Sequence, residues 1–146
     1  MTNIKIGGRE IPLNFTTYEM IAIQKEIGCN AAELRDQVFG LHLADEDNPN
    51  SWQLEVGRDP EKMEKLGKLI RILGNSGLEE NGKEPDLTDK WVLRNMKPGL
   101  ILAYALVAMA EINESQKSET AEEEQKERGE TSEIVLEEER KKAPEK

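Results

Sequence analysis

The sequence predicts an α+β fold class: a mainly helical domain that begins with a short β-hairpin and is followed by a charged carboxy-terminal arm. Apolar residues alternate near the amino terminus, and beyond residue 16 they recur at helical spacing behind capping signals. Residues 115–146 differ, because they hold 18 charged residues among 32 and five apolar ones. Such a segment buries too little apolar surface to offset the entropy of ordering it. We therefore expect a compact body, residues 1–114, and an arm, residues 115–146, that is disordered or becomes helical on a partner.

The chain opens with a predicted hairpin. Polar and apolar residues alternate on both sides of Gly7-Gly8, a pair that tolerates the positive φ values of a tight turn. Pro12 removes one ladder donor, which suits an edge strand. Two strands alone are marginally stable, so their apolar face is expected to pack on helices. That face comprises Ile4, Ile6, Ile11, Leu13 and Phe15.

Two capping boxes predict the first two helices. Thr16 with Glu19, and Asn30 with Glu33, have the spacing at which each side chain satisfies the other residue's backbone N–H group. The first helix is expected to end at Gly28. Its predicted apolar stripe contains Met20, Ile21, Ile23 and Ile27, and that of the second helix contains Leu34, Val38 and Leu41.

A third helix is predicted from Asp59-Pro60, because Asp caps well and Pro is favoured at the first helical position. Before it, residues 44–59 are expected to form an acidic loop pinned by Trp52 and Leu54. The helix is expected to end at Gly74, and residues 75–85 to form a second loop with turns at Ser76-Gly77 and Asn81-Gly82. Its predicted buried side chains are Met63, Leu66, Ile70 and Leu73.

Two more helices complete the predicted body. Thr88 is expected to cap a short helix that stops before Pro98, with Leu87 and Val92 forming a hydrophobic staple. A last helix over residues 100–114 has apolar residues on every side, which is typical of a central helix packed against several neighbours.

Composition and charge argue against several classes of protein, among them proteins that bind nucleic acid and proteins that span a membrane. The 146 residues include 30 acids against 20 bases, for a net charge of −10. Negative charge in both body and arm argues against nucleic acid and anionic membranes as partners, since both require clustered Lys and Arg. The longest apolar run, residues 100–110, is about half a membrane span. With one cysteine and no secretory signal at the start, we expect a soluble cytoplasmic protein.

The sequence holds few residues suited to catalysis. His42 is the only histidine, so neither a histidine metal cluster nor a conventional triad can be assembled in one chain. We interpret it as packing or capping a helix end. Cys29 follows Gly28 between two helices, where a buried structural thiol is commoner than a reactive one.

Three further motifs favour structural roles. Residues 45–48 are acidic, but they lack the glycine and distal glutamate of a calcium loop. Residues 74–77 lack the lysine that follows a phosphate-binding loop, and are interpreted as a turn. Trp52 and Trp91 are interpreted as core or loop anchors, with an interface hot spot as the alternative. We predict no enzymatic activity, no catalytic or metal-binding residues and no cofactor.

One apolar triplet interrupts the arm: Ile134, Val135 and Leu136, flanked by Glu133 and by acids at 137–139. Such a triplet in a charged stretch is typical of a short motif that folds on a partner. We predict that these three residues bind a partner. The alternative is an exposed helix that packs weakly on the body.

The layout resembles a known family. A hairpin with Gly7-Gly8 and the run of residues 11–17 lead into a helix that begins Tyr18-Glu19-Met20, followed by a small helical body and a charged arm. This is similar to the tail assembly chaperones of long-tailed bacteriophages and prophages, most closely over residues 4–28.

The resemblance implies a function. Members of that family are small, acidic, mostly helical and non-enzymatic; they coat the tape measure protein, recruit tail tube subunits and are absent from the finished virion. Many are made in two lengths by a programmed frameshift. Because such a chaperone repeats along its client, self-association is expected. The alternatives are a non-enzymatic regulatory adaptor and a structural head–tail connector subunit.

Overall fold

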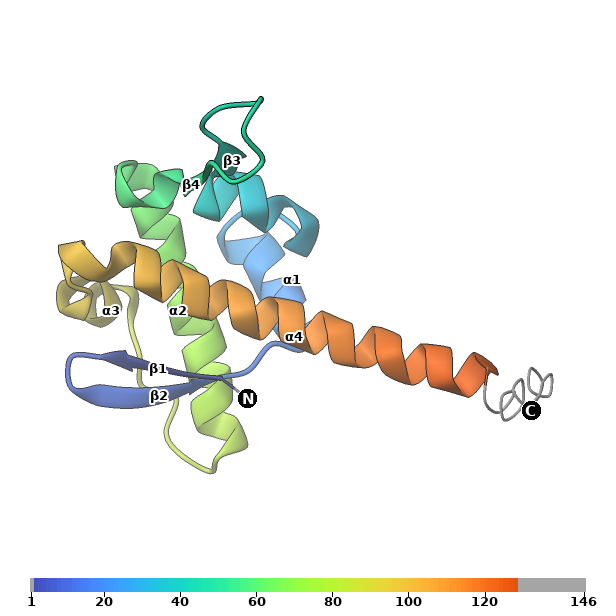
Figure 1. Ribbon diagram of the computed structural model, residues 1–146. Coiled ribbons are helices and arrows are strands. Elements are labelled where there is room, and N and C mark those ends of the chain that lie inside the picture. Colours follow the sequence, from blue (N-terminus) through green and yellow to red (C-terminus); the bar gives the residue numbers. More distant parts are fainter. Residues whose placement is uncertain (1, 129–146) are drawn as a thin grey trace. The chain divides into compact units, whose positions relative to one another are not determined.

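A computed structural model describes residues 2–128 of the chain, and the side chains of residues 2–116. Contacts divide the chain into two compact units, Met1–Glu111 and Ile112–Lys146. The first unit holds two hairpins and the helices that pack on them (Figure 1). The predicted α+β class, mainly helical with an amino-terminal hairpin, is confirmed. The boundary between the units lies slightly before the predicted body–arm boundary at residue 114.

The amino-terminal hairpin pairs β1 (Thr2–Ile6) with β2 (Arg9–Leu13) in antiparallel register, with Ile4 opposite Ile11. Gly7 and Gly8 form the turn at φ +59° and +75°, a backbone conformation that side chains rarely allow. The predicted apolar face is buried, so the hairpin prediction is confirmed. This face packs on α2 (Pro60–Glu80). Its buried members are Ile4, Ile6, Ile11, Leu13 and Phe15.

The helix α2 begins as predicted, with the Asp59 carboxylate accepting a hydrogen bond of 3.0 Å from the backbone N–H of Glu61. It continues through Gly74 to Glu80, so the prediction of an end at Gly74 and a turn at Ser76-Gly77 is wrong. The reason is close packing on the hairpin: a Cβ atom on Gly77 would lie 1.8 Å from the carbonyl oxygen of Pro12. The glycines here allow α2 to pack closely on the hairpin and do not end the helix.

The first capping box is present, with the backbone N–H of Thr16 donating to Glu19 Oε1 at 2.9 Å. Helix α1 (Thr17–Glu26) follows, and Gly28 lies just beyond its end. Its predicted apolar stripe is only partly buried. Ile23 is fully buried, whereas Met20 and Ile21 are exposed. The helix packs on α2 along a narrow stripe, so the neighbouring apolar positions remain in solvent.

The second predicted helix is replaced by shorter turns. The Asn30–Glu33 capping box forms, with reciprocal hydrogen bonds of 2.9 Å. It opens a 3₁₀ turn, Ala31–Glu33, and then a π-helical turn, Arg35–Phe39. Leu34 and Val38 are buried as predicted. The chain then extends, because Gly40 ends the turn in the left-handed region at φ +62°.

A second hairpin takes the place of the end of the predicted second helix and of part of the predicted loop. Strand β3 (Leu41–Leu43) pairs antiparallel with β4 (Trp52–Leu54), placing Leu43 opposite Trp52. Trp52 does not pin this region to the core, since 51% of it is exposed. Val56, in the 3₁₀ turn Glu55–Gly57, is the fully buried side chain here.

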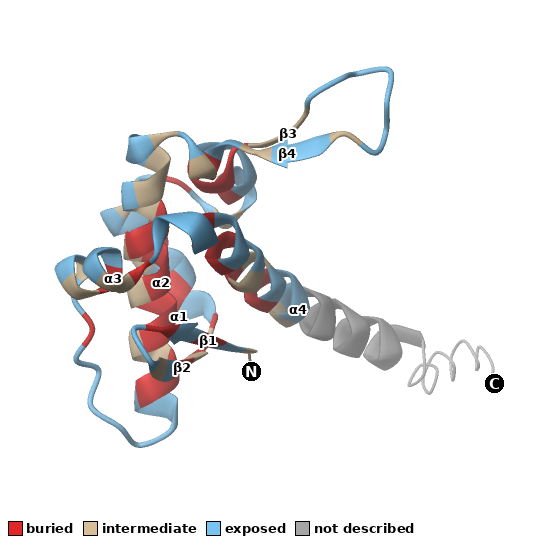
Figure 2. Cartoon of the chain, turned by 60° about the vertical axis from the view of Figure 1, so that its left-hand side comes forward, coloured by how far each residue is buried: buried red, intermediate tan, exposed pale blue. Residues whose placement is uncertain are grey.

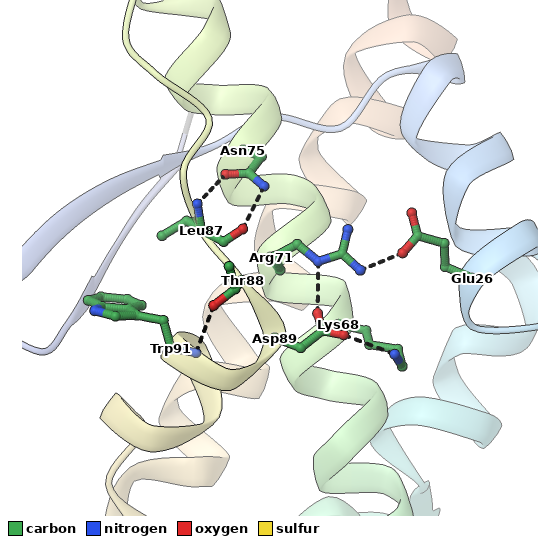
Figure 3. Close-up of polar contacts among 8 residues, drawn as sticks. All are labelled: Glu26, Lys68, Arg71, Asn75, Leu87, Thr88, Asp89 and Trp91. Carbon is green, nitrogen blue, oxygen red and sulfur yellow. Dashed lines mark hydrogen bonds and ion pairs between the residues drawn. The ribbon is translucent and has the colours of Figure 1, made fainter.

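Helix α3 (Asp89–Asn95) is attached to α2 by polar contacts (Figure 3). Thr88 caps it as predicted, accepting a 3.0 Å hydrogen bond from the backbone N–H of Trp91. The Asn75 side chain in α2 exchanges two hydrogen bonds with the backbone of Leu87, of 3.0 and 3.1 Å. Leu87 and Val92 are buried, as the predicted staple requires.

An ion-pair cluster joins α1, α2 and α3 (Figure 3). Arg71 in α2 binds Glu26 of α1 and, at 2.8 Å, Asp89 of α3. Lys68 contacts the other oxygen of Asp89 at 2.9 Å. Partial burial raises the pKa of Asp89, but the hydrogen bonds from Arg71 and Lys68 outweigh it and hold this pKa below its ordinary value. The cluster therefore holds the three helices together most strongly when Asp89 is ionised.

Helix α4 (Ile101–Arg128) follows the 3₁₀ turn Pro98–Leu100. One side of its first turns is buried: Ile101, Tyr104, Ala105 and Ala108. The prediction of a central helix packed on every side is wrong, because Leu102 and Leu106 lie in solvent. Figure 2 shows buried and exposed positions together on the first turns of α4.

Candidate functional site: an apolar groove

An open groove of about 630 Å³ lies within the first unit, beside the exposed face of α4. The β3–β4 hairpin forms one wall, and the Pro98–Gly99 turn and the first turns of α4 form the other. The lining is mainly apolar. It consists of Leu41, Trp52, Gln53, Leu54, Gly57, Arg58, Pro98, Gly99, Ile101, Leu102 and Leu106.

Three large apolar side chains stand open to solvent in this groove. Trp52 is 51% exposed, Leu102 46% and Leu106 56%. Leu102 and Leu106 are four residues apart, so they point from the same face of α4. Leu102 lies close to the backbone of Gly57, where an added Cβ atom would be 3.2 Å from it. Contiguous exposed apolar surface of this kind marks protein-binding sites more often than it occurs by chance.

Two guanidinium groups border the groove. Arg58 lines it and donates a hydrogen bond of 3.3 Å to the side-chain oxygen of Gln53. Arg35 lies over the Trp52 ring at 5.9 Å from its centre, a cation–π contact that orients the indole. Among the side chains of residues 2–116, neither guanidinium forms an ion pair with a carboxylate. The groove therefore combines an apolar lining with one guanidinium group, that of Arg58, and a second guanidinium group, that of Arg35, contacts the lining residue Trp52.

The predicted structural role of His42 agrees with its position in β3. Its Nδ1 atom lies 3.0 Å from the carbonyl oxygen of Gly40, so the ring closes the turn that precedes the strand. It also borders a polar pocket of about 450 Å³ with Glu55, Arg58 and Asp59. Asp59 is already engaged as the cap of α2. Burial raises its pKa, and backbone hydrogen bonds from Glu61 and Lys62 more than offset this and lower it.

The thiol of Cys29 is fully buried. Burial raises its pKa, Glu33 raises it further, and Lys65 offsets part of the increase. A thiol in this environment stays protonated near neutral pH, which agrees with its interpretation as structural.

The acidic loop between β3 and β4 is held by its own turns. Asp45 accepts a 3.0 Å hydrogen bond from the backbone N–H of Asp47, and Asn48 accepts one of 3.0 Å from that of Asn50. Within the described part of the chain, no three His, Cys, Asp or Glu side chains are grouped so as to hold a metal ion.

The remaining sequence motifs fall in different places. Residues 74–77 lie inside α2, where they contact the hairpin rather than a ligand. Trp91 is half-buried and lies under Arg9, 5.7 Å from the ring centre. The predicted partner-binding residues Ile134, Val135 and Leu136 lie outside the described residues.

Sequence reasoning missed the groove because its lining comes from two segments about fifty residues apart. Helical spacing correctly placed apolar residues on all sides of α4, but spacing alone does not say which side is covered. The available signal for this groove was Trp52, for which an interface hot spot was the alternative interpretation.

No protein-family model matches the chain, and no curated protein or solved structure matches it significantly. In the described residues, no single helix has the length and apolar composition to cross a membrane. One pair of helical segments, Asp89–Asn95 and Pro98–Gln116, passes that test together, with a bend of 90° between them.

Proposed function

We propose that this chain is a non-enzymatic chaperone for tail assembly in a long-tailed phage, binding the tape measure protein and recruiting tail tube subunits. The observation that carries the proposal is the open apolar groove of Trp52, Leu102 and Leu106. The layout of residues 4–28, which resembles that chaperone family, supplies the identity of the client. We place the protein in the host cytoplasm during assembly and not in the mature virion.

The groove suits a peptide better than a small polar substrate. Its volume falls in the range of about 300–1,000 Å³ typical of ligand clefts, but its lining is apolar with few converging polar groups. An amphipathic helix docks into such a groove through apolar residues at helical spacing. A half-exposed Trp beside two leucines is the composition expected of an interface hot spot. Before the tube closes around it, a tape measure protein needs this kind of cover along its length.

Co-expression tests the proposal. The cognate tape measure protein should remain soluble with the wild-type chain and aggregate when the chaperone carries Leu102→Glu and Leu106→Glu. Both side chains are about half exposed, so the substitutions should remove groove contacts without unfolding the body. Thermal unfolding of the double variant, followed by circular dichroism, checks this second expectation.

Ile21→Glu provides the matched control, because Ile21 is 52% exposed but lies on α1, away from the groove lining. This variant should protect the client as the wild type does. If the groove variant also protects the client fully, the groove is not the client site. Recovery of the chain in purified virions would instead favour a head–tail connector, and client-independent binding to a host regulator would favour an adaptor.

A further inference from the structure

We infer that, in the absence of client, the groove of one copy binds residues 133–139 of a second copy. This inference rests on the proposed function, since it assigns a resting occupant to the proposed client site. The occupant has the sequence Glu-Ile-Val-Leu-Glu-Glu-Glu. The resulting contact keeps the apolar groove covered until a client displaces the segment.

The chemistry of the segment matches that of the groove. Its apolar triplet fits a lining that includes Trp52, Leu102 and Leu106. Its flanking carboxylates match the guanidinium groups of Arg35 and Arg58. A carboxylate that pairs with a guanidinium beside an apolar contact gains charge-assisted hydrogen bonds in partly desolvated surroundings.

Charge also explains why the acidic segment binds at the groove rather than elsewhere on the surface. The chain has 30 acids and 20 bases, so an acidic segment is repelled by most of the surface. Among the other arginines of the first unit, Arg9 pairs with Asp86 at 2.8 Å and Arg71 pairs with Glu26 and Asp89, whereas Arg94 forms no ion pair with a described side chain but does not line the groove. Arg35 and Arg58 have no such partner among the described side chains.

A second copy is taken as the donor, because a chaperone that repeats along a long client is expected to self-associate. Binding of the acidic segment of one copy in the groove of another provides that association and covers the groove while no client is bound.

A contact of this kind is heterologous: the groove of one copy binds the segment of the next. Such contacts repeat head to tail and form rings or open chains. A chain of chaperones with its grooves in a row would be ready to transfer to a long client, one copy at a time.

Disulfide trapping in the full-length protein tests the inference. Gln53→Cys places a thiol on the groove wall, and Glu133→Cys places one beside the triplet. The buried Cys29 should not compete under mild oxidation. Mixing the two single variants should yield a covalent dimer that is at least tenfold more abundant than with Lys83→Cys in place of Gln53→Cys. Lys83 is exposed in the α2–α3 loop and serves as the matched control.

The double variant Gln53→Cys/Glu133→Cys separates the possible donors. A second-copy donor predicts a ladder of linked chains, whereas cross-links confined to single chains at all concentrations would overturn the inference. Dimer yield equal to the Lys83→Cys control would overturn it as well.

A charge exchange provides an independent measurement. Arg35→Glu with Arg58→Glu should weaken self-association, followed by sedimentation, at least tenfold. Mixing that variant with one carrying Glu137→Arg and Glu138→Arg should restore it. If the mixture associates no better than the groove variant alone, the pairing is wrong.

The client assay separates this inference from the proposed function. Ile134→Ser, Val135→Ser and Leu136→Ser together should abolish self-association and leave protection of the tape measure protein intact or improved. Loss of both client protection and self-association in the groove variants, with loss of self-association alone in the triple variant, supports both. Self-association through the groove without any client protection would keep the inference and reject the proposed function.

Discussion

At the scale of single residues, Gly77 shows how one missing side chain positions two elements. The carbonyl group of Pro12 in β2 occupies the space that a Cβ atom on Gly77 would need. Because a backbone carbonyl cannot rotate away as a side chain can, the contact leaves no room for any larger residue. The residue that would usually end a helix is here retained inside one.

Gly77→Ala should therefore lower the free energy of unfolding by about 3 kcal/mol, the upper part of the range for overpacked cores. Gly67→Ala in the same helix is the control, since its Cβ atom would meet only the end of the Leu93 side chain, which is partly exposed and can move. That change should stay within about 1 kcal/mol of the wild type, because Ala also favours the helix by a similar amount. Urea unfolding measures both, and equal losses would contradict the packing explanation.

At the scale of elements, α3 depends on polar contacts because it is short. Seven residues provide few buried side chains, and an isolated helix of that length is not stable in water. Asn75 holds the segment before α3, and Asp89 in its first turn connects it to Lys68 and Arg71 of α2. These contacts place Trp91 and the turn that leads into the groove.

The lowered pKa of Asp89 predicts how this attachment depends on pH. A carboxyl group with a folded-state pKa below its unfolded value stabilises the fold at higher pH, and this stabilisation is lost as pH falls through the folded pKa. The free energy of unfolding should thus be steady from about pH 7 to pH 5 and decrease below about pH 4. Asp89→Asn should lower stability near neutral pH and flatten the acid part of the curve.

Asp36→Asn is a suitable control for that series, because Asp36 is exposed on the π-helical turn. It should leave the acid dependence close to that of the wild type. A wild-type curve and an Asp89→Asn curve that remain parallel from pH 7 to pH 3 would show that the ion-pair cluster does not contribute in this way.

At the scale of the whole molecule, the first unit contains the elements that form both hairpins and the groove. Truncation after Ser118 removes only Ala121, Ile134, Val135, Leu136 and Ala143 from the apolar residues of the chain. The truncation therefore removes little apolar surface that could be buried on folding. We expect the truncated protein to keep its free energy of unfolding within about 1 kcal/mol.

Urea unfolding should be compared at protein concentrations low enough to suppress self-association, because binding between copies raises apparent stability by mass action. At low concentration, the truncated protein should have the same free energy of unfolding as the full chain. Only at high concentration should it be less stable than the full chain. A large loss at low concentration would mean that the residues after 118 contribute to the core of their own chain.

The sequence by itself determined the features whose causes lie within a few residues. The Gly7-Gly8 turn, the two capping boxes and the Asp59-Pro60 start each depend on contacts between near neighbours, and each forms as predicted. Alternation likewise identified the buried face of the first hairpin. Local hydrogen bonds and backbone preferences suffice for these choices.

Only the tertiary structure decided which of two equally permitted local outcomes occurs. Whether the chain turns at Ser76-Gly77 or continues as α2 depends on Pro12, sixty-five positions before Gly77, and which side of α4 is covered depends on the elements that reach it. The short β3–β4 pairing likewise joins the end of the predicted second helix to part of the predicted loop. The groove exists because this pairing holds Trp52 opposite Leu102 and Leu106, while the other side of α4 is buried. Burial depends on contacts between segments that are distant along the chain. The periodicity of apolar residues within one segment does not predict those contacts.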